Sequence, residues 1–144
     1  MLVHQILKHK GDQGVVTVPP SMTVAEAAKL LDEKRIGTLV ISSTGDTADG
    51  ICSERDIVRE VARRGSVCLE TKVEEIMSRN IITCGLGEKA DAVLATMTEK
   101  RFRHMPVVDA GVMVGFISIG DVVKARLTEL AMEKDALEGM IMGH

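Results

Sequence analysis

Hydrophobic positions along the chain repeat in two similar blocks. A segment that begins at Thr23 carries apolar residues spaced three and four apart, which is typical of one buried face of a helix. Adding 66 to each position gives a second segment with the same spacing. We therefore predict two equivalent helices within an internal duplication. The apolar sets are Val24, Ala27, Ala28 and Leu31 in the first block and Ala90, Val93, Leu94 and Met97 in the second.

Short apolar runs predict the strands of each block, and turn residues such as Gly45 and Gly111 separate them. Each block also begins with a short lead helix and ends with a closing helix, so each forms one βαββα unit. The predicted lead helices cover residues 3–7 and 73–77, and the predicted strands cover residues 15–18, 39–42 and 50–52, then 81–84, 105–108 and 112–118.

The order of these elements predicts an α+β fold with two repeats, at residues 1–65 and 73–138, joined by residues 66–72. A unit of about 65 residues buries too little surface to be comfortably stable by itself. We therefore expect the two units to pack sheet against sheet around a pseudo-twofold axis.

The closing helix of the second block is longer than the repeat requires. Its apolar residues lie near one stripe, which Lys134 interrupts. This stripe either covers the lead helix of the same chain or forms a contact between two copies of the chain. Its members are Val123, Leu127, Leu130, Leu137 and Ile141.

The composition excludes several classes of function. The chain has 144 residues, of which 45% are hydrophobic and 27% are charged, a balance typical of a globular domain. The formal net charge of −3 argues against a broad nucleic-acid surface, because phosphate backbones are bound mainly by clustered Lys and Arg. No apolar run approaches the roughly 20 residues of a membrane helix, and the first residues lack the apolar core of a secretory signal. We therefore expect a cytoplasmic protein that binds neither nucleic acid nor membranes.

The sequence offers little for catalysis or metal binding. Cys52, Cys68 and Cys84 form neither a CxxC pair nor an even set, which argues against disulfides and a zinc site. The histidines lack the spacing of metal ligands, so we expect no metal requirement. We also predict that the protein is not an enzyme, since a nucleotide hydrolase or transferase would need a nucleophile with a base, and none stands out.

One pattern occurs once in each block: Gly, two apolar residues, Ser, two variable residues and Asp, at residues 50–56 and 115–121. The serine stands where a strand turns into a helix, so its hydroxyl and the N–H groups of the first turn can hold a phosphate. The aspartate carboxylate can accept hydrogen bonds from both hydroxyls of a ribose. Gly50 and Gly115 would leave space for a purine.

Two features of this pattern also have purely structural interpretations. Ser-x-x-Asp is a capping box, which starts a helix without any ligand, although capping and ligand binding are compatible. Arg55, Arg59 and Arg63 recur every four residues, which predicts either a phosphate-binding face or a solvated face paired with Asp56 and Glu60.

The duplicated unit, the two Gly-to-Asp strings and residues 101–109 resemble a pair of CBS domains, which are named for cystathionine beta-synthase; such a pair is also called a Bateman module. The resemblance covers nearly the whole chain. It implies a regulatory module that binds adenosine ligands such as AMP, ADP, ATP, NAD or S-adenosylmethionine in clefts between the two units. It also implies a homodimer, because such modules commonly dimerise into a flat disc.

The resemblance further implies a set of ligand-binding residues in each copy. The ribose-binding aspartate corresponds to Asp56 and Asp121, and the phosphate-facing hydroxyl corresponds to Ser53 and Ser118. The remaining positions are Thr17, Val18, Gly37, Thr38, Leu39 and Arg55 in the first copy, and Ile82, Thr83, Arg103, His104, Met105, Pro106 and Gly120 in the second.

The two sets are not equivalent in charge. Where the first copy has Gly37, the second has Arg103, followed by the titratable ring of His104, and a phosphate chain would prefer that environment. Conversely, Arg55 in the first copy corresponds to Gly120 in the second. One ligand can draw on both copies, so the sequence alone does not assign these charges to sites.

We therefore predict a sensor module that holds an adenine nucleotide, such as AMP, ATP or NAD, and signals to an unknown partner protein. The signal would be a shift between two arrangements, driven by the difference in ligand affinity between them. The alternative is a purely structural dimerisation module, in which the pockets are empty and the Ser-x-x-Asp boxes only cap helices.

Overall fold

The computed structural model describes residues 1–11 and 15–141. Its contacts divide the chain into two compact units. The first-repeat unit contains residues 15–81 and 111–113, and the second-repeat unit contains residues 1–11, 82–110 and 114–141. The segment that opens the chain therefore belongs to the unit of the second repeat.

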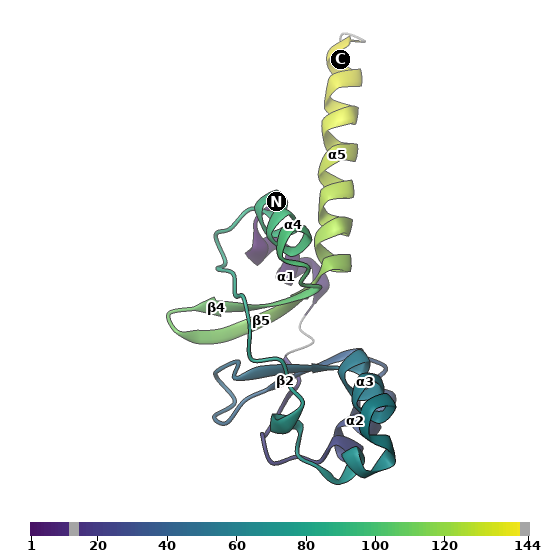
Figure 1. Ribbon diagram of the computed structural model, residues 1–144. Coiled ribbons are helices and arrows are strands. Elements are labelled where there is room, and N and C mark those ends of the chain that lie inside the picture. Colours follow the sequence, from purple (N-terminus) through teal and green to yellow (C-terminus); the bar gives the residue numbers. More distant parts are fainter. Residues whose placement is uncertain (12–14, 142–144) are drawn as a thin grey trace. The chain divides into compact units, whose positions relative to one another are not determined.

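The first-repeat unit is built around a three-stranded sheet with the order β1-β2-β3. Strand β1 is parallel to β2, and β2 is antiparallel to β3, with Thr38 opposite Ser53. Its elements are β1 (Thr17–Val18), α2 (Val24–Lys34), β2 (Thr38–Ile41), β3 (Gly50–Ser53) and α3 (Glu54–Arg64), then the 3-10 segments η1 (Gly65–Glu70) and η2 (Val73–Glu75) (Figure 1).

Helix α2 forms where the apolar spacing predicts it. The Thr23 hydroxyl caps its start by accepting the Glu26 N–H at 3.2 Å. The predicted face is buried through Val24, Ala27 and Leu31, which join the core of this unit. In the second-repeat unit, Ala90, Val93 and Met97 of α4 (Ala90–Lys100) are buried in the same way, so the duplicated helix is confirmed.

The second-repeat unit contains α1 (Val3–Lys10), α4, β4 (His104–Asp109), most of β5 (Val112–Ser118) and α5 (Ile119–Ile141). Strands β4 and β5 form a two-stranded sheet. The strand predicted at residues 81–84 is wrong, because only a single parallel bridge, between Cys84 and Val107, forms there. In the first repeat the Val40 N–H donates to the Val16 carbonyl, but the equivalent residue Pro106 has no N–H, so the ladder stops.

The two lead segments differ in length. In the first segment, the helix predicted at residues 3–7 continues to Lys10 and ends at Gly11, whose φ is 88°. The second, predicted as a helix at residues 73–77, is only the 3-10 turn η2. The predicted connection at residues 66–72 is not a plain loop, since most of it belongs to η1.

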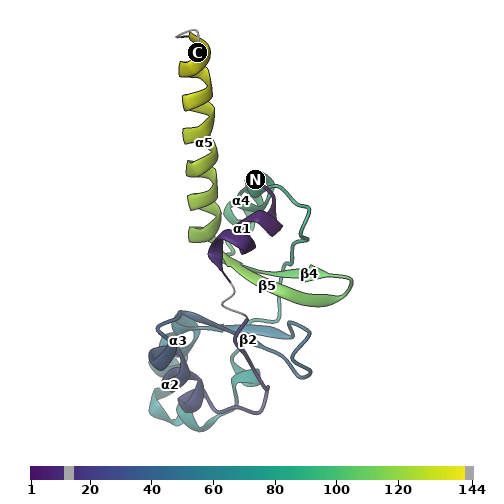
Figure 2. The same ribbon diagram turned by 180° about the vertical axis from the view of Figure 1, so that it is seen from behind.

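Helix α5 packs on its own unit only through its first turns, where Val122 and Ala125 are buried. Farther along, the helix stands clear of α1 and α4 in both views (Figures 1 and 2). The apolar stripe does not cover the lead helix, because it lies on a different face of α5 from Val122 and Ala125. None of the described helices is long and apolar enough to cross a membrane.

Candidate functional site

The Ser–Asp turn of the first repeat stands at the junction of β3 and α3. The Asp56 Oδ2 atom accepts the Ser53 backbone N–H at 2.8 Å and the Ser53 hydroxyl at 3.1 Å. In return, the Ser53 Oγ atom accepts the Asp56 N–H at 3.3 Å. The predicted capping box is therefore present, and it places a half-buried carboxylate at the end of the sheet.

The second repeat builds the same turn between β5 and α5. The Ser118 N–H donates to Asp121 Oδ2 at 2.9 Å, and the Asp121 N–H donates to Ser118 Oγ at 3.1 Å. Each repeat also ties the entry of its middle strand to this turn. The Gly37 carbonyl accepts the Glu54 N–H at 2.9 Å, and the Arg103 carbonyl accepts the Ile119 N–H at 2.8 Å. We call the predicted ligand-binding residues around each turn a half-site.

Lys10 lies beside the second half-site, although no sequence pattern predicts it there. Its Nζ atom lies 3.0 Å from Asp121 Oδ2 and 2.9 Å from the Phe116 carbonyl oxygen. The residue ends α1, 111 positions away from Asp121. The missing information was the place of α1, because no sequence signal puts the lead helix beside the second repeat.

This environment keeps Asp121 ionised. Burial raises the pKa of Asp121, but the Ser118 N–H and the Lys10 ammonium together outweigh burial and hold this pKa below its ordinary value. Because Asp121 already accepts hydrogen bonds from these donors, it can accept ribose hydroxyls only through its remaining lone pairs. Asp56 has a different cation, since Arg59 of its own helix lies 3.5 Å from its Oδ1 atom.

His104 begins β4 and stacks on Phe116 of β5, with the ring centroids 5.4 Å apart and the planes 5° from parallel. Burial, followed by the nearby Lys10 and Arg103 charges, lowers the pKa of His104, while Asp121 opposes the shift. The ring is therefore neutral at pH 7. The fixed positive charge of this half-site comes from Lys10 and Arg103.

Several predicted site residues have side chains that face a core. Val18, Leu39 and Met105 are at most 3% exposed, and Thr38 and Pro106 are also buried. Toward a ligand these five positions offer mainly backbone atoms. The other predicted positions are exposed or half-buried in their own unit, namely Thr17, Gly37, Ser53, Arg55 and Asp56 in the first repeat and Ile82, Thr83, Arg103, His104, Ser118, Gly120 and Asp121 in the second.

The arginines of α3 divide into two groups. Arg59 pairs with Asp56, and Arg63 pairs with Glu60 at 3.9 Å, so the interpretation as a solvated ionic face is confirmed for both. Arg55 lies in the first turn of α3 with an exposed side chain. It therefore supplies an exposed positive charge beside the Ser–Asp turn of the first repeat.

The space expected for a purine at Gly50 and Gly115 is filled by the chain itself. An added Cβ atom at Gly50 would collide with the Met77 side chain, and one at Gly115 would lie 2.7 Å from Leu7 Cδ1. The prediction was wrong because these glycines receive the lead segments. They therefore explain why each lead segment packs on the other repeat.

Two buried thiols are unsuited to nucleophilic chemistry. Burial, with a smaller contribution from the Asp56 and Glu88 charges, raises the pKa of both Cys52 and Cys84 to about 12. Cys52 is a core residue, as its position in an apolar strand predicts. Across the described parts of the chain, no three His, Cys, Asp or Glu side chains gather as they would around a metal ion.

A cavity of about 240 Å³ adjoins Asp121 in the second-repeat unit. Its lining includes the Asp121 carboxylate and the side chains of His9, Lys10, Lys124 and Thr128. This local excess of positive charge contrasts with the net charge of −3 of the whole chain. The surroundings of Asp121 therefore favour an anion.

The family model of the CBS domain matches residues 12–63 and 73–128. The CBS-domain containing protein ATU1752 from Agrobacterium tumefaciens is 40% identical, with a TM-score of 0.82 over 88% of this chain and 99% of that chain. PAE2072 from Pyrobaculum aerophilum, complexed with AMP, is 28% identical, with a TM-score of 0.75 over 92% and 99%. The CBS domain pair of MJ0100, in complex with 5′-methylthioadenosine and S-adenosyl-L-methionine, is 28% identical, with a TM-score of 0.76 over 90% and 98%.

Proposed function

Because this chain belongs to the CBS domain family and carries the family motif twice, we propose that it is a regulatory sensor that binds an adenine nucleotide. The observation that supports this most is the repeated turn in which Ser53 and Ser118 hold a half-buried carboxylate at the end of a sheet. Related structures bind AMP in one case and S-adenosylmethionine with methylthioadenosine in another.

The charges around Asp121 favour a ligand with phosphate, such as AMP, ATP or NAD. Lys10 has three N–H donors, of which two are used by Asp121 and the Phe116 carbonyl, so one remains for a phosphate oxygen. Arg103 and Lys124 add two further cations nearby. The sulfonium of S-adenosylmethionine would gain nothing from these cations.

The proposed signal is a change in the arrangement of the two repeats. A ligand that contacts both repeats favours one arrangement only by the difference of its affinities for the two. The change would alter the contact with a second copy or with a regulated partner protein. We place this activity in the cytoplasm, where adenine nucleotides are abundant.

A structural role without a ligand is the second candidate. It is favoured by the complete capping boxes and by the fact that Lys10 already pairs with Asp121. In that case the Ser–Asp turns serve only to start α3 and α5. The two candidates differ in a measurable way, because only the sensor is stabilised by adenine compounds.

A thermal-shift panel of AMP, ATP, NAD, S-adenosylmethionine and GTP tests the proposal. A ligand at a hundred times its dissociation constant stabilises the folded protein by about 2.7 kcal/mol, which raises the melting temperature visibly. We expect AMP, ATP or NAD to give this shift and GTP to give none. The structural role is correct instead if no adenine compound shifts the melting temperature at millimolar concentration.

A further inference from the structure

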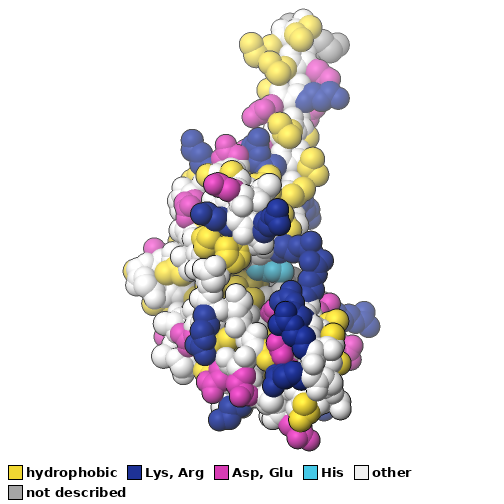
Figure 3. Space-filling model, viewed as in Figure 1, with side chains coloured by type: hydrophobic (Ala, Val, Ile, Leu, Met, Phe, Trp, Pro, Cys, Tyr) yellow, Lys and Arg dark blue, Asp and Glu magenta, His cyan; other side chains and the backbone are white. Residues whose placement is uncertain are grey.

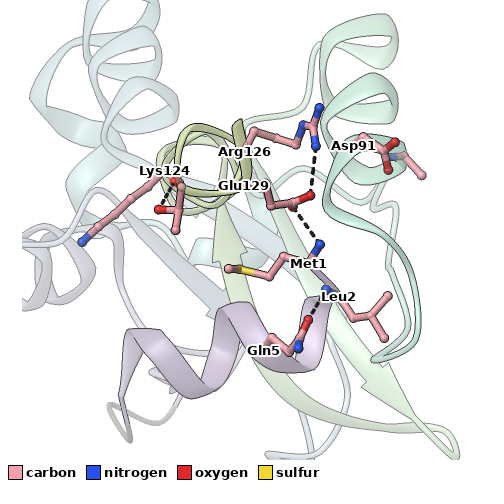
Figure 4. Close-up of polar contacts among 9 residues, drawn as sticks. Met1, Leu2, Gln5, Asp91, Lys124, Arg126 and Glu129 are labelled. Atoms are coloured by element: carbon pink, nitrogen blue, oxygen red, sulfur yellow. Dashed lines mark hydrogen bonds and ion pairs between the residues drawn. The ribbon is translucent and has the colours of Figure 1, made fainter. Parts of the chain in front are cut away.

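Helix α5 is held to its unit by one face. Val122 and Ala125 are buried on this face, and the Glu129 carboxylate forms two ion pairs, with the Met1 ammonium at 2.8 Å and with Arg126 at 3.0 Å (Figure 4). These contacts end near the middle of the 23-residue helix. The remaining turns extend beyond the unit with their side chains in solvent.

A different face of α5 carries a regular apolar seam, spaced alternately by four and three residues. This spacing is the a and d pattern of a coiled coil, in which a helix buries a narrow stripe against another helix. Leu127 is 63% exposed, Leu137 59% and Ile141 84%. The seam comprises Val123, Leu127, Leu130, Lys134, Leu137 and Ile141, and Figure 3 shows apolar side chains along the exposed helix.

An exposed seam of this kind requires a partner. Isolated helices shorter than about 12–15 residues are marginal in water, and most helical stability comes from burying an apolar face. The distal half of α5 has such a face and leaves it uncovered. A seam repeating every 3.5 residues fits a second helix better than a flat surface.

The charges on α5 disfavour a parallel pair of identical helices. In that arrangement the two Lys134 side chains would meet at one a layer, and Glu133 would face Glu138 across the seam. Like charges in these positions are destabilising. The seam therefore disfavours two copies that run in the same direction.

An antiparallel pair resolves both conflicts in a single register. When Leu127 faces Leu137 of a second copy, Val123 faces Ile141, and Lys134 faces Leu130 instead of another lysine. The same register sets Lys124 beside Glu138 and leaves one like-charge contact, between the two Glu133 side chains near the twofold axis, where a parallel pair has three such contacts. The attractive Lys124–Glu138 pair occurs twice, because a twofold interface is self-complementary.

We propose that the uncovered seam of α5 is a docking surface for a second copy of this chain, which binds in antiparallel orientation in this register. The proposal does not depend on nucleotide binding, because the seam contains none of the half-site residues. Lys124, which flanks the seam, also lines the cavity beside Asp121, so the tests below are made without nucleotide. It specifies the interface of a homodimer by the complementarity of its charges.

Cysteine cross-linking of the full chain tests the orientation. Under mild oxidation, a mixture of the Leu127→Cys and Leu137→Cys variants should give a disulfide-linked dimer, while each variant alone should give none. The wild-type chain, whose three cysteines are buried, is the control. A parallel pair would link Leu127→Cys to itself, and that result would overturn the proposal.

Sedimentation analysis tests the charges. The Glu138→Lys variant should dimerise about tenfold more weakly, because two attractive pairs become repulsive, and adding Lys124→Glu should restore dimerisation. Asp135→Lys is the matched control, since Asp135 is on the same helix but outside the seam and its flanks. Tighter dimerisation of Glu138→Lys would contradict the antiparallel orientation, because this substitution relieves the Glu133–Glu138 repulsion only in a parallel pair.

Two further results would also overturn the proposal. A purified chain that stays monomeric at high concentration would show that another occupant covers the seam, and this would overturn the proposal. The Leu127→Asp/Leu130→Asp variant should be monomeric with a folded circular-dichroism spectrum, because both side chains are exposed in the single chain. A dimer that persists in this variant would place the interface elsewhere.

Discussion

Lys10, at the end of α1, links the lead helix to the second repeat through its contacts with Asp121 and Phe116. Replacing it with methionine removes the ammonium but keeps an apolar stem. We expect Lys10→Met to raise the pKa of Asp121 and to lower the free energy of unfolding by about 1 kcal/mol, because a part-buried hydrogen-bonded ion pair is lost.

The same variant tests the role of Lys10 toward the ligand. Calorimetry should show AMP binding weakened about tenfold, the equivalent of one charge-assisted hydrogen bond, with adenosine binding unchanged. Lys8→Met, an exposed change on the same helix, is the control. If AMP and adenosine weaken equally, Lys10 acts on the fold and not on the phosphate.

His104 makes stability depend on pH near neutrality. Its pKa in the folded protein is below the ordinary value of 6.5, so the unfolded chain takes up the proton first as pH falls. The free energy of unfolding should therefore decrease as pH falls from about 6.5 toward the folded pKa, and be constant in this respect above 6.5. Lys10 and Arg103 strengthen this effect, while Asp121 opposes it.

Denaturant titrations between neutral and mildly acidic pH measure this slope. The His104→Gln variant should lose the part of the slope that His104 contributes, while His4→Gln, at an exposed position of α1, should keep it. An unchanged slope in His104→Gln would show that another group titrates there. The sequence predicted a titratable ring at this position, but its pKa depends on burial that only the fold provides.

At the scale of elements, the exchange of lead segments explains two glycines of the repeated motif. In Gly115→Ala, the new Cβ atom would meet Leu7, so we expect a loss of about 1–3 kcal/mol in the free energy of unfolding from overpacking. Gly87→Ala is the control, since an added Cβ atom there meets open space. Chemical denaturation of both variants measures the difference.

Leu7→Ala in the Gly115→Ala background provides the decisive comparison. Removing the Leu7 branch should relieve the collision, so the double variant should be more stable than the sum of the two single changes predicts. Simple additivity would show that Leu7 does not press on Gly115. The glycine of the motif would then need another explanation within the strand itself.

The elements also show which features a sequence can predict. The buried faces of α2 and α4 follow directly from apolar spacing, and both Ser–Asp turns form where their capping pattern predicts. The strand at residues 81–84 failed because its partner Pro106 lacks an N–H, a detail that matters only once the pairing is known. Lys10 was missed because it reaches Asp121 through the fold and not through the sequence.

At the scale of the whole molecule, the chain combines two separate features, the half-sites and the seam of α5. The half-sites depend on short turns repeated in both halves, whereas the seam of α5 has no counterpart in the first repeat. A regulatory module needs both a ligand site and a surface that transmits the signal. The proposed nucleotide sites and the proposed helix pair supply these two parts separately.

The central claim is that the repeated aspartates bind an adenine nucleotide. Calorimetric titration of AMP into the wild-type chain, Asp56→Asn and Asp121→Asn tests it most directly, with Asp91→Asn, an exposed acid in the first turn of α4, as the control. We predict that at least one motif variant loses AMP binding while the control keeps the wild-type affinity. Equal affinity in the wild-type chain and both motif variants, or no binding to any of them, would contradict the account.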